Sequence, residues 1–319
     1  MRIIKKYKNE KRILITGSSG MLGKSLIKKL NYKIFTPKRQ NLNLLNFDKI
    51  KQYIRKNRIN FVIHCAAKVG GIQDNVKNQL EYLVENVNIN KNVIMASYEE
   101  GIKNFINIGS SCIYPKNVKK KISEKLIFKG NFEPTNEGYA VSKFLSIKIC
   151  KFISEKDGYN YKTLVPTNLY GPNDNYNLEK SHLLAAIIKK LSDAKKKKIK
   201  HIEIWGNGKA RREFMYISDL SEAILFAIKN FPKLPLVLNI GTGKDYTVEN
   251  YYKKASKIIL PSAKFYFNKK KPMGMKRKLL DVSISKKLGW KAKVSLTQGI
   301  KKTYKEYKKK YEDQTSTVS

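Results

Sequence analysis

Three regularly spaced glycines after a short apolar stretch constrain this fold more than any other feature. Residues 11–16 read Lys-Arg-Ile-Leu-Ile-Thr, which is typical of a buried strand. Gly17, Gly20 and Gly23 follow, and residues 24–30 have helical periodicity. This is the context of dinucleotide binding, because glycines let the backbone approach a pyrophosphate and a helix N-terminus offers free N–H groups. An ordinary glycine turn is the alternative, but the flanking segments favour phosphate binding.

The rest of the chain alternates between apolar runs and helical patterns. Strands with their exit turns are predicted at 34–36, 60–67, 105–108, 163–172 and 237–243, and helices at 86–100, 181–191, 216–229 and after Trp290. Alternation of this kind predicts an α/β fold with a doubly wound parallel (Rossmann) sheet. We expect the Rossmann domain at 8–175 and 214–245, a smaller C-terminal substrate-binding domain at 176–213 and 246–311, and a disordered tail at 312–319.

The end of the second predicted strand bears on the choice of cofactor. A dinucleotide fold that binds NAD usually places Asp or Glu there, where it hydrogen-bonds the ribose. In this chain Pro37, Lys38 and Arg39 occupy the position. Two cations suit a 2′-phosphate, so NADP(H) is favoured over NAD(H). The alternative is that both cations only belong to a generally basic surface.

A Tyr-x-x-x-Lys pattern lies in a predicted helix, at Tyr139 and Lys143. Residues four apart share one face of a helix, so the phenol and the ammonium group are expected side by side. A neighbouring ammonium favours the phenolate and lowers the pKa of a tyrosine. Such a phenol can exchange a proton with a carbonyl or alcohol oxygen. In a chain this rich in Tyr and Lys, coincidence is the alternative, so the pattern depends on its companions.

One companion follows the strand predicted at 105–108. By the rule for open parallel sheets, chemistry sits at the carboxyl ends of the strands, which places Ser110 near the same carbonyl oxygen as Tyr139. A helix cap is the alternative for the Ser110–Ser111 pair. Cys112 can equally be a small buried hydrophobic residue.

The charge is unusual, because 66 Lys and Arg against 25 Asp and Glu give a formal net charge of +41. Lysine dominates and is spread along the chain, which gives unspecific, salt-dependent attraction to polyanions. We therefore expect no specific nucleic-acid partner. No apolar run is long enough for a membrane span. The cysteines, Cys65, Cys112 and Cys150, are widely spaced, which suits the cytoplasm, and no Cys/His cluster has metal-ligand spacing.

Together these segments resemble the extended short-chain dehydrogenase/reductase family, and within it the group of bacterial GDP-L-fucose synthases. The resemblance runs from about residue 11 to residue 305. Its sharpest motifs are Ala-Ala-Lys-Val-Gly-Gly-Ile at 66–72 and Gly-Ser-Ser-Cys-Ile-Tyr-Pro-Lys at 109–116. Further matching segments are 133–137, 166–174, 181–182, 205–208, 212–214 and 277–281.

The resemblance implies an NADPH-dependent epimerisation at C3 and C5 of GDP-4-keto-6-deoxy-D-mannose, followed by reduction at C4 to GDP-L-fucose. It implies that Cys112 is the base and His182 the acid of the epimerisation. Tyr139 then protonates the C4 oxygen, and Ser110 helps to stabilise the enolate. Lys143 also holds the nicotinamide ribose. A homodimer is implied as well, in which two long helices of the cofactor domain pair with those of a second copy.

The site residues carried over by the resemblance fall into three sets, and no metal ligand is among them. The catalytic set is Ser110, Cys112, Tyr139, Lys143 and His182. The cofactor-binding set is Gly17, Ser18, Ser19, Gly20, Met21, Leu22, Gly23, Lys38, Arg39, Asn41, Leu42, Ala66, Ile108, Gly109, Ser110, Ser111, Lys143, Pro166, Thr167, Asn168, Leu169 and His182. The substrate-binding set is Lys190, Trp205, Arg212 and Lys278.

Some positions depart from the pattern of the group. Ser19 and Pro37 stand where the group has arginines near the 2′-phosphate, Lys190 replaces a nucleotide-contacting arginine, and Met273 replaces a substrate-contacting aspartate. The last change favours a second hypothesis, a C4 reductase of a related GDP-4-keto-6-deoxy sugar such as a heptose. A non-catalytic nucleotide or nucleic-acid binder is a third, which Ser110, Tyr139 and Lys143 argue against.

Overall fold

The computed structural model describes residues 11–271 and 275–313. Met273 and residues 314–319 of the expected tail lie outside this part of the chain. The start of that tail at residue 312 stays a prediction, and Glu312 itself lies within the described part. Its backbone N–H donates to the carbonyl oxygen of Lys308 at the end of the last helix, and its carboxylate hydrogen-bonds Ser192.

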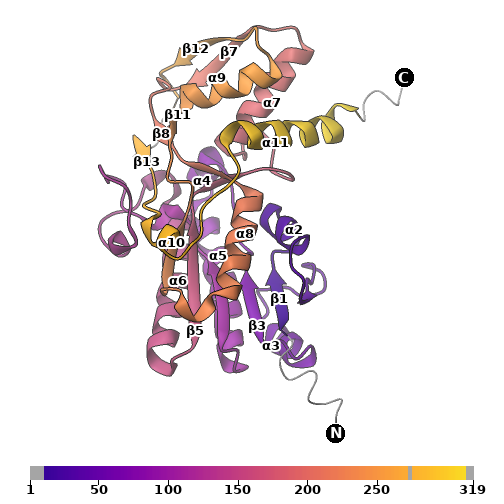
Figure 1. Cartoon of the computed structure of the whole chain (residues 1–319), viewed down its shortest axis with the longest axis vertical. Coiled ribbons are helices and arrows are strands. Elements are labelled where there is room, and N and C mark those ends of the chain that lie inside the picture. Colours follow the sequence, from indigo (N-terminus) through magenta and orange to yellow (C-terminus); the bar gives the residue numbers. More distant parts are fainter. Residues whose placement is uncertain (1–10, 272–274, 314–319) are drawn as a thin grey trace.

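A six-stranded parallel sheet forms the centre of the larger part of the molecule, in the order β10-β5-β4-β3-β1-β2 (Figure 1). Its central strands are runs of buried apolar residues, as expected where helices cover both faces. After β2 the chain crosses back over β1 to form β3, so the strand order reverses there. The strands are β1 (Arg12–Thr16), β2 (Lys33–Phe35), β3 (Phe61–His64), β4 (Asn104–Ile108), β5 (Asn160–Pro166) and β10 (Val237–Ile240).

Helices cover both faces of this sheet, which confirms the doubly wound α/β fold. On one face, Ile54 and Ile94 share a core with strand residues; the helices are α3 (Phe47–Lys56), α5 (Gln79–Glu99) and α6 (Glu137–Asp157). On the other face, Leu26 of α2 (Met21–Ile27) and Leu220 of α8 (Ile217–Lys229) share a second core with strand residues. Trp290 joins this core from outside the two helices. The short helix α10 (Ser283–Lys287) lies beside β10.

A smaller part with its own hydrophobic core lies above the carboxyl ends of the sheet (Figure 1). Leu184, Tyr251 and Ile300 from three different helices meet in this core. The elements are α7 (Leu183–Lys196), α9 (Val248–Ile259), α11 (Leu296–Tyr311) and the parallel pair β7 (His201–Trp205) and β12 (Lys264–Asn268). The division into two domains at the predicted boundaries stays a prediction.

Short elements join the two parts. Strand β6 (Asn168–Tyr170) pairs with β9 (Phe214–Tyr216), and β8 (Arg211–Arg212) lies between β11 (Tyr246–Thr247) and β13 (Arg277–Lys278). The remaining helical segments are α4 (Ile72–Lys77) and the 3-10 turns η1 (Ser111–Ile113), η2 (Glu124–Leu126), η3 (Pro134–Asn136) and η4 (Phe231–Lys233).

Two helices differ from their predicted bounds. The helix expected at 86–100 begins earlier, at Gln79. In its first turns Tyr82 is buried whereas the apolar Leu80 and Val84 are exposed, so the apolar pattern does not mark the buried face. The helix expected to end at residue 191 continues to Lys196, so Lys195 and Lys196 lie in its last turn. Lysines in the last turn of a helix interact favourably with its dipole.

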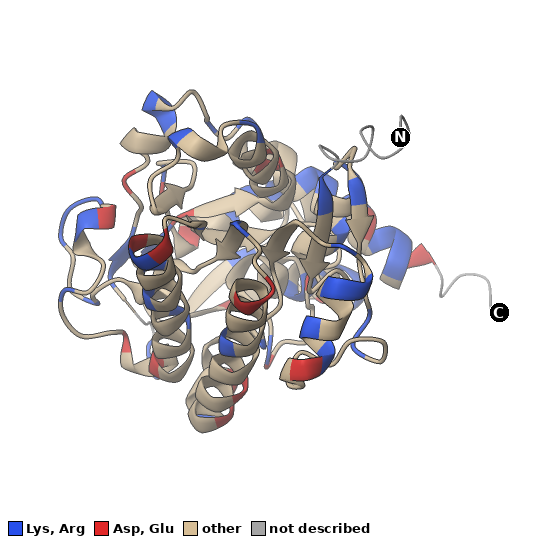
Figure 2. Cartoon of the chain, turned by 90° about the horizontal axis from the view of Figure 1, so that it is seen from below, with Lys and Arg blue, Asp and Glu red and all other residues tan. Residues whose placement is uncertain are grey.

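Lysine and arginine are distributed over most of the visible helices and loops rather than gathered on one face (Figure 2). Cys65, Cys112 and Cys150 are all free thiols. Among the residues that the structure describes, no helix has the length and apolar character needed to cross a membrane.

Candidate active site

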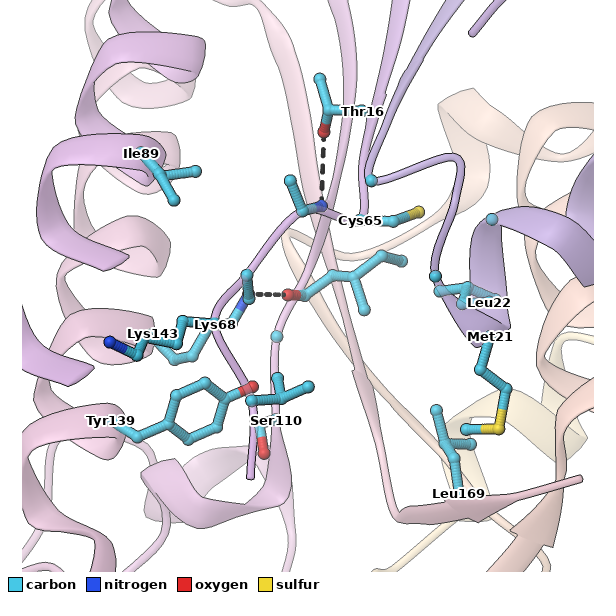
Figure 3. A pocket seen from close by; sticks show the side chains of 18 of the residues that line it. Thr16, Met21, Leu22, Cys65, Lys68, Ile89, Ser110, Tyr139, Lys143 and Leu169 are labelled. Atoms are coloured by element: carbon cyan, nitrogen blue, oxygen red, sulfur yellow. Dashed lines mark hydrogen bonds between the residues drawn. The ribbon is translucent and has the colours of Figure 1, made fainter. Parts of the chain in front are cut away.

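A cavity of about 730 Å³ opens at the carboxyl ends of the central strands (Figure 3). Each strand contributes the residue that follows it or lies just beyond: Gly17 after β1, Cys65 after β3, Gly109 after β4 and Thr167 after β5. The cavity therefore lies where the strand order reverses, which is where open α/β sheets bind their ligands.

The glycine turn forms a cradle at one end of this cavity. Gly17 has φ +69°, and a Cβ there would meet the Ala66 Cα at 2.7 Å. A Cβ at Gly23 would collide with the carbonyl oxygen of Gly17. Only glycine therefore lets the turn lie this close to β3 and to the start of α2. Because these positions carry no side chains, the backbone N–H groups are open to the close approach of a pyrophosphate.

Arg39 is the cation that faces the cavity at the end of β2. It lines the wall with Pro37 and Leu42, and its guanidinium lies 3.7 Å from a carboxylate oxygen of Glu85. Lys38 and Asn41, which were predicted to contact the cofactor, are not among the lining residues. The structure therefore brings one of the two predicted cations to the cavity.

Most of the other predicted cofactor residues do line the cavity, from all four strand ends. They are Ser18, Ser19, Gly20, Met21, Leu22, Leu42, Ala66, Ile108, Gly109, Ser110, Ser111, Lys143, Pro166, Thr167, Asn168, Leu169 and His182. Sequence reasoning missed Thr16, Lys68, Glu85, Ile89 and Asn136. Thr16 and Lys68 adjoin predicted strand ends, which was a usable signal, whereas Glu85 lies in the part of α5 that precedes the predicted helix at 86–100.

Tyr139 and Lys143 lie one turn apart on α6 and both line the cavity (Figure 3). The Lys143 ammonium is buried and donates a hydrogen bond of 2.9 Å to the carbonyl oxygen of Ile108 at the end of β4. Burial lowers the pKa of Lys143 to about 8, although Cys112 and Cys65 act in the opposite direction. The side chain is thereby fixed between α6 and the sheet.

The pKa of Tyr139 moves opposite to the expectation that Lys143 would lower it. Burial is the largest influence and raises this pKa, and hydrogen bonding with Ser110 only partly offsets it. The phenol is therefore protonated at neutral pH, which suits a proton donor better than a base. Ser110 also accepts a hydrogen bond of 3.4 Å from the backbone N–H of Cys112, so it caps η1 and faces the phenol at the same time.

Two further proton carriers line the same cavity from opposite parts of the molecule. Cys112 is buried on η1, and burial raises the pKa of its thiol, while Lys278, Ser110 and Lys143 act against this. His182 directly precedes α7. Desolvation by the surrounding protein is the main cause that lowers its pKa, and the positive charge of Lys278 lowers it further. Its imidazole is therefore neutral at physiological pH.

The predicted substrate residues form two groups. Lys278 lines the cavity, and Arg212 lies directly opposite it in the β8–β13 pair. Lys190 and Trp205 lie together in the smaller part, where the Lys190 ammonium is 5.0 Å from the centre of the Trp205 ring. Glu203 fixes this second group by accepting a 2.8 Å hydrogen bond from the indole N–H. Lys190 and Trp205 are not among the residues that line the described cavity.

Comparison with known proteins relates the chain to one family. Residues 13–241 match the NAD dependent epimerase/dehydratase family. A GDP-L-colitose synthase of Yersinia pseudotuberculosis is 42% identical over 92% of this chain and 96% of its own length. A GDP-L-fucose synthase of Azorhizobium caulinodans is 39% identical over 93% of this chain and 96% of its own.

A solved structure extends this likeness to three dimensions. A GDP-mannoheptose C4 reductase from Campylobacter jejuni with NADP bound superimposes with a TM-score of 0.85 at 29% identity. The match covers 94% of this chain and 99% of that chain.

Proposed function

We propose, from the premise that this chain belongs to the NAD dependent epimerase/dehydratase family, that it is an NADPH-dependent epimerase and reductase of a GDP-linked 4-keto-6-deoxy sugar. The observation that carries the proposal is the convergence of chemically different groups in one cavity. A phenol, a hydroxyl, a thiol, an imidazole and two ammonium groups line it: Tyr139, Ser110, Cys112, His182, Lys143 and Lys278.

Tyr139 and Ser110 would hold the sugar's C4 ketone. Hydrogen bonds from both to the carbonyl oxygen stabilise negative charge on that oxygen and so acidify the C–H bonds at C3 and C5. Because burial keeps the Tyr139 phenol protonated, the same group can give its proton to the C4 oxygen as the alcohol forms.

Cys112 and His182 would carry the protons of the epimerisation, Cys112 as the base and His182 as the acid. They reach the cavity from η1 and from the residue before α7, so a sugar ring between them would present one face to each. The charges of Lys278 and Lys143 favour the Cys112 thiolate when it forms. Because the lowered pKa of His182 leaves its imidazole neutral at physiological pH, His182 would take up a proton before it gives one to the sugar.

The residues around the glycine turn fit NADP(H), which would supply the hydride for C4. The turn from Gly17 to Gly23 would take the pyrophosphate, and Arg39 the 2′-phosphate. Lys143, held by Ile108, would orient the nicotinamide ribose. Arg212 and Lys278, which are cross-strand neighbours, together with the Lys190–Trp205 pair, would bind the GDP-sugar.

Among such sugars we favour GDP-4-keto-6-deoxy-D-mannose, with GDP-L-fucose as the product. Cys112 and His182 support a substrate that is epimerised as well as reduced. The similarity to a GDP-L-colitose synthase favours a second candidate, because L-colitose is L-fucose without its 3-hydroxyl group. A GDP-4-keto heptose is a third, favoured by the likeness to a GDP-mannoheptose reductase.

The test is turnover of these three GDP-4-keto sugars with NADPH, compared by kcat/KM and by NMR of the products. We expect the mannose-derived ketone to be the best substrate and GDP-L-fucose to be formed. A higher kcat/KM for the 3-deoxy sugar or the heptose would reject the fucose assignment alone. Absence of turnover with all three would reject the whole proposal.

We further propose that two copies of the chain pair through α5 and α6. These helices pack against each other and carry apolar side chains on their outer surfaces, with Leu80 69% exposed and Phe152 58% exposed. Exposed apolar side chains on two neighbouring helices support an interface at this face.

A further inference from the structure

Glu85 is a carboxylate in a cavity otherwise lined by cations and neutral groups. Among the described residues that line the cavity, it is the only Asp or Glu, whereas Arg39, Lys68, Lys143 and Lys278 also line it. This is unexpected in a chain that is proposed to bind an anionic cofactor and an anionic substrate. A carboxylate at such a place either repels part of the ligand or accepts a hydrogen bond from it.

The contacts of Glu85 place it at the end of the cavity next to β2. We call this the ribose end, because Arg39 there is proposed to meet the 2′-phosphate of the cofactor ribose. One carboxylate oxygen lies 3.7 Å from the guanidinium of Arg39, just after β2, and the other lies 3.2 Å from the ammonium of Lys68. Lys68 is itself held in place, because its backbone N–H donates to Asn86 and its ammonium lies 5.5 Å from the centre of the Tyr82 ring. Glu85 therefore engages both cations of this end.

The other two lysines belong to the catalytic end of the cavity. Lys143 bonds the Ile108 carbonyl at the end of β4, and Lys278 lies on β13. The charged residues that line the ribose end are therefore Arg39, Lys68 and Glu85, which together carry one net positive charge. Ser19 and Pro37, which also line this end, add no charge.

We propose that Glu85 sets the discrimination between NADP(H) and NAD(H) by opposing the 2′-phosphate and accepting a hydrogen bond from the 2′-hydroxyl. A 2′-phosphate must compete with Glu85 for Arg39 and is repelled by the carboxylate. A ribose 2′-hydroxyl has no such conflict and can donate to a carboxylate, as in NAD-binding folds. The inference rests on the proposed function, and it makes this chain an enzyme that accepts both cofactors with a weak preference for NADP(H).

The test is calorimetric titration of NADP⁺ and NAD⁺ into the full-length protein and its variants, at low and high ionic strength. Glu85→Gln keeps the shape of the side chain and removes its charge. Glu81→Gln is the matched control, because Glu81 lies one turn earlier on α5, is exposed and does not line the cavity. Adding Arg39→Gln to Glu85→Gln shows whether the effect acts through Arg39.

We expect Glu85→Gln to tighten NADP⁺ binding about tenfold at low salt and to leave NAD⁺ unchanged or up to about threefold weaker. Glu81→Gln should change neither affinity by more than about twofold, higher salt should reduce the gain, and the Arg39→Gln change should abolish most of it. An NADP⁺/NAD⁺ affinity ratio equal in Glu85→Gln and Glu81→Gln overturns the inference, as does weaker NADP⁺ binding in Glu85→Gln. Wild-type protein that binds neither dinucleotide overturns the proposed function itself.

Discussion

At the scale of single residues, the chemistry depends on how burial tunes groups that are ordinary elsewhere. The phenol of Tyr139 stays protonated because burial raises its pKa, and the neighbouring Lys143 has its pKa lowered to about 8 for the same reason. One environment thus acts in opposite directions on an acid and on a base, since desolvation always disfavours the charged form.

Tyr139→Phe tests the role of this phenol. Removing the hydroxyl removes the proton donor to the C4 oxygen, so kcat should fall by about 100-fold or more. The dissociation constant for NADP⁺ should stay within about twofold, because binding does not need the proton. Tyr98→Phe, which removes a phenol that bonds Asp157 outside the cavity, should leave kcat unchanged. Equal kcat in the two variants would contradict the assignment.

Cys112→Ser separates epimerisation from reduction. Serine is a far weaker base than a thiolate at neutral pH, so washout of the C3 and C5 hydrogens of the ketone into D₂O should slow by about 100-fold or more. Reduction of a ketone that is already epimerised should fall much less. The buried Cys150, which packs in the core between α5 and α6, gives the control variant Cys150→Ser. Parallel loss of both activities in Cys112→Ser alone would remove the proposed split of roles.

At the scale of elements, the short strands β8, β11 and β13 decide where Arg212 and Lys278 lie, the cations proposed to bind the substrate. Asp245, just before β11, accepts hydrogen bonds from Arg211 at 2.9 Å and from Arg277 at 2.6 Å. Residues 211 and 277 are paired in register, and so are Arg212 and Lys278. The carboxylate therefore fixes the register that presents Lys278 to the cavity.

Asp245→Asn tests this link through its pH dependence. Burial alone would raise the pKa of Asp245, but hydrogen bonds from Arg211 and Arg277 outweigh burial and lower it to about 2 from 3.8. A lowered folded-state pKa stabilises the fold above the unfolded value and loses that contribution as the pH falls through the folded value. Urea denaturation should therefore give Asp245→Asn a loss of about 1 to 2 kcal/mol near neutral pH, shrinking between pH 4 and pH 2.

The control for Asp245 is Asp193→Asn on α7. Asp193 pairs with Lys189 on the surface, with its side chain 35% exposed, so its loss should cost about 0.5 kcal/mol or less. A pH-independent difference between Asp245→Asn and wild type would contradict the proposed ion pairs.

Particular elements illustrate what could be predicted from the sequence. The strands and the glycine turn were found because their residues are contiguous and buried, so local pattern and final environment coincide. The start of α5 was missed because its first turns bury Tyr82 but expose the apolar Leu80 and Val84. Glu85 was missed with it, since its importance depends on Arg39 and Lys68, which lie far from it in sequence. The pKa of Tyr139 was misjudged because burial, which no pattern of spacing reports, exceeds the influence of Lys143.

At the scale of the whole molecule, the pairing of α5 and α6 across two copies can be tested by sedimentation velocity. Leu80→Glu and Phe152→Glu each place a charge in the proposed apolar interface, so each should convert a dimer to a monomer at micromolar concentration. Phe267→Glu on β12 is the control, because Phe267 is 41% exposed but lies in the smaller part. A wild-type monomer, or dimers in all variants, would contradict this interface.

The measurement that tests the central claim most directly is turnover of GDP-4-keto-6-deoxy-D-mannose with NADPH in D₂O, with the product examined by NMR. If one cavity both exchanges protons beside the ketone and reduces it, the product should carry deuterium at C3 and C5 and ordinary hydrogen at C4. A reduced product that keeps its original hydrogen at both C3 and C5 would contradict the claim.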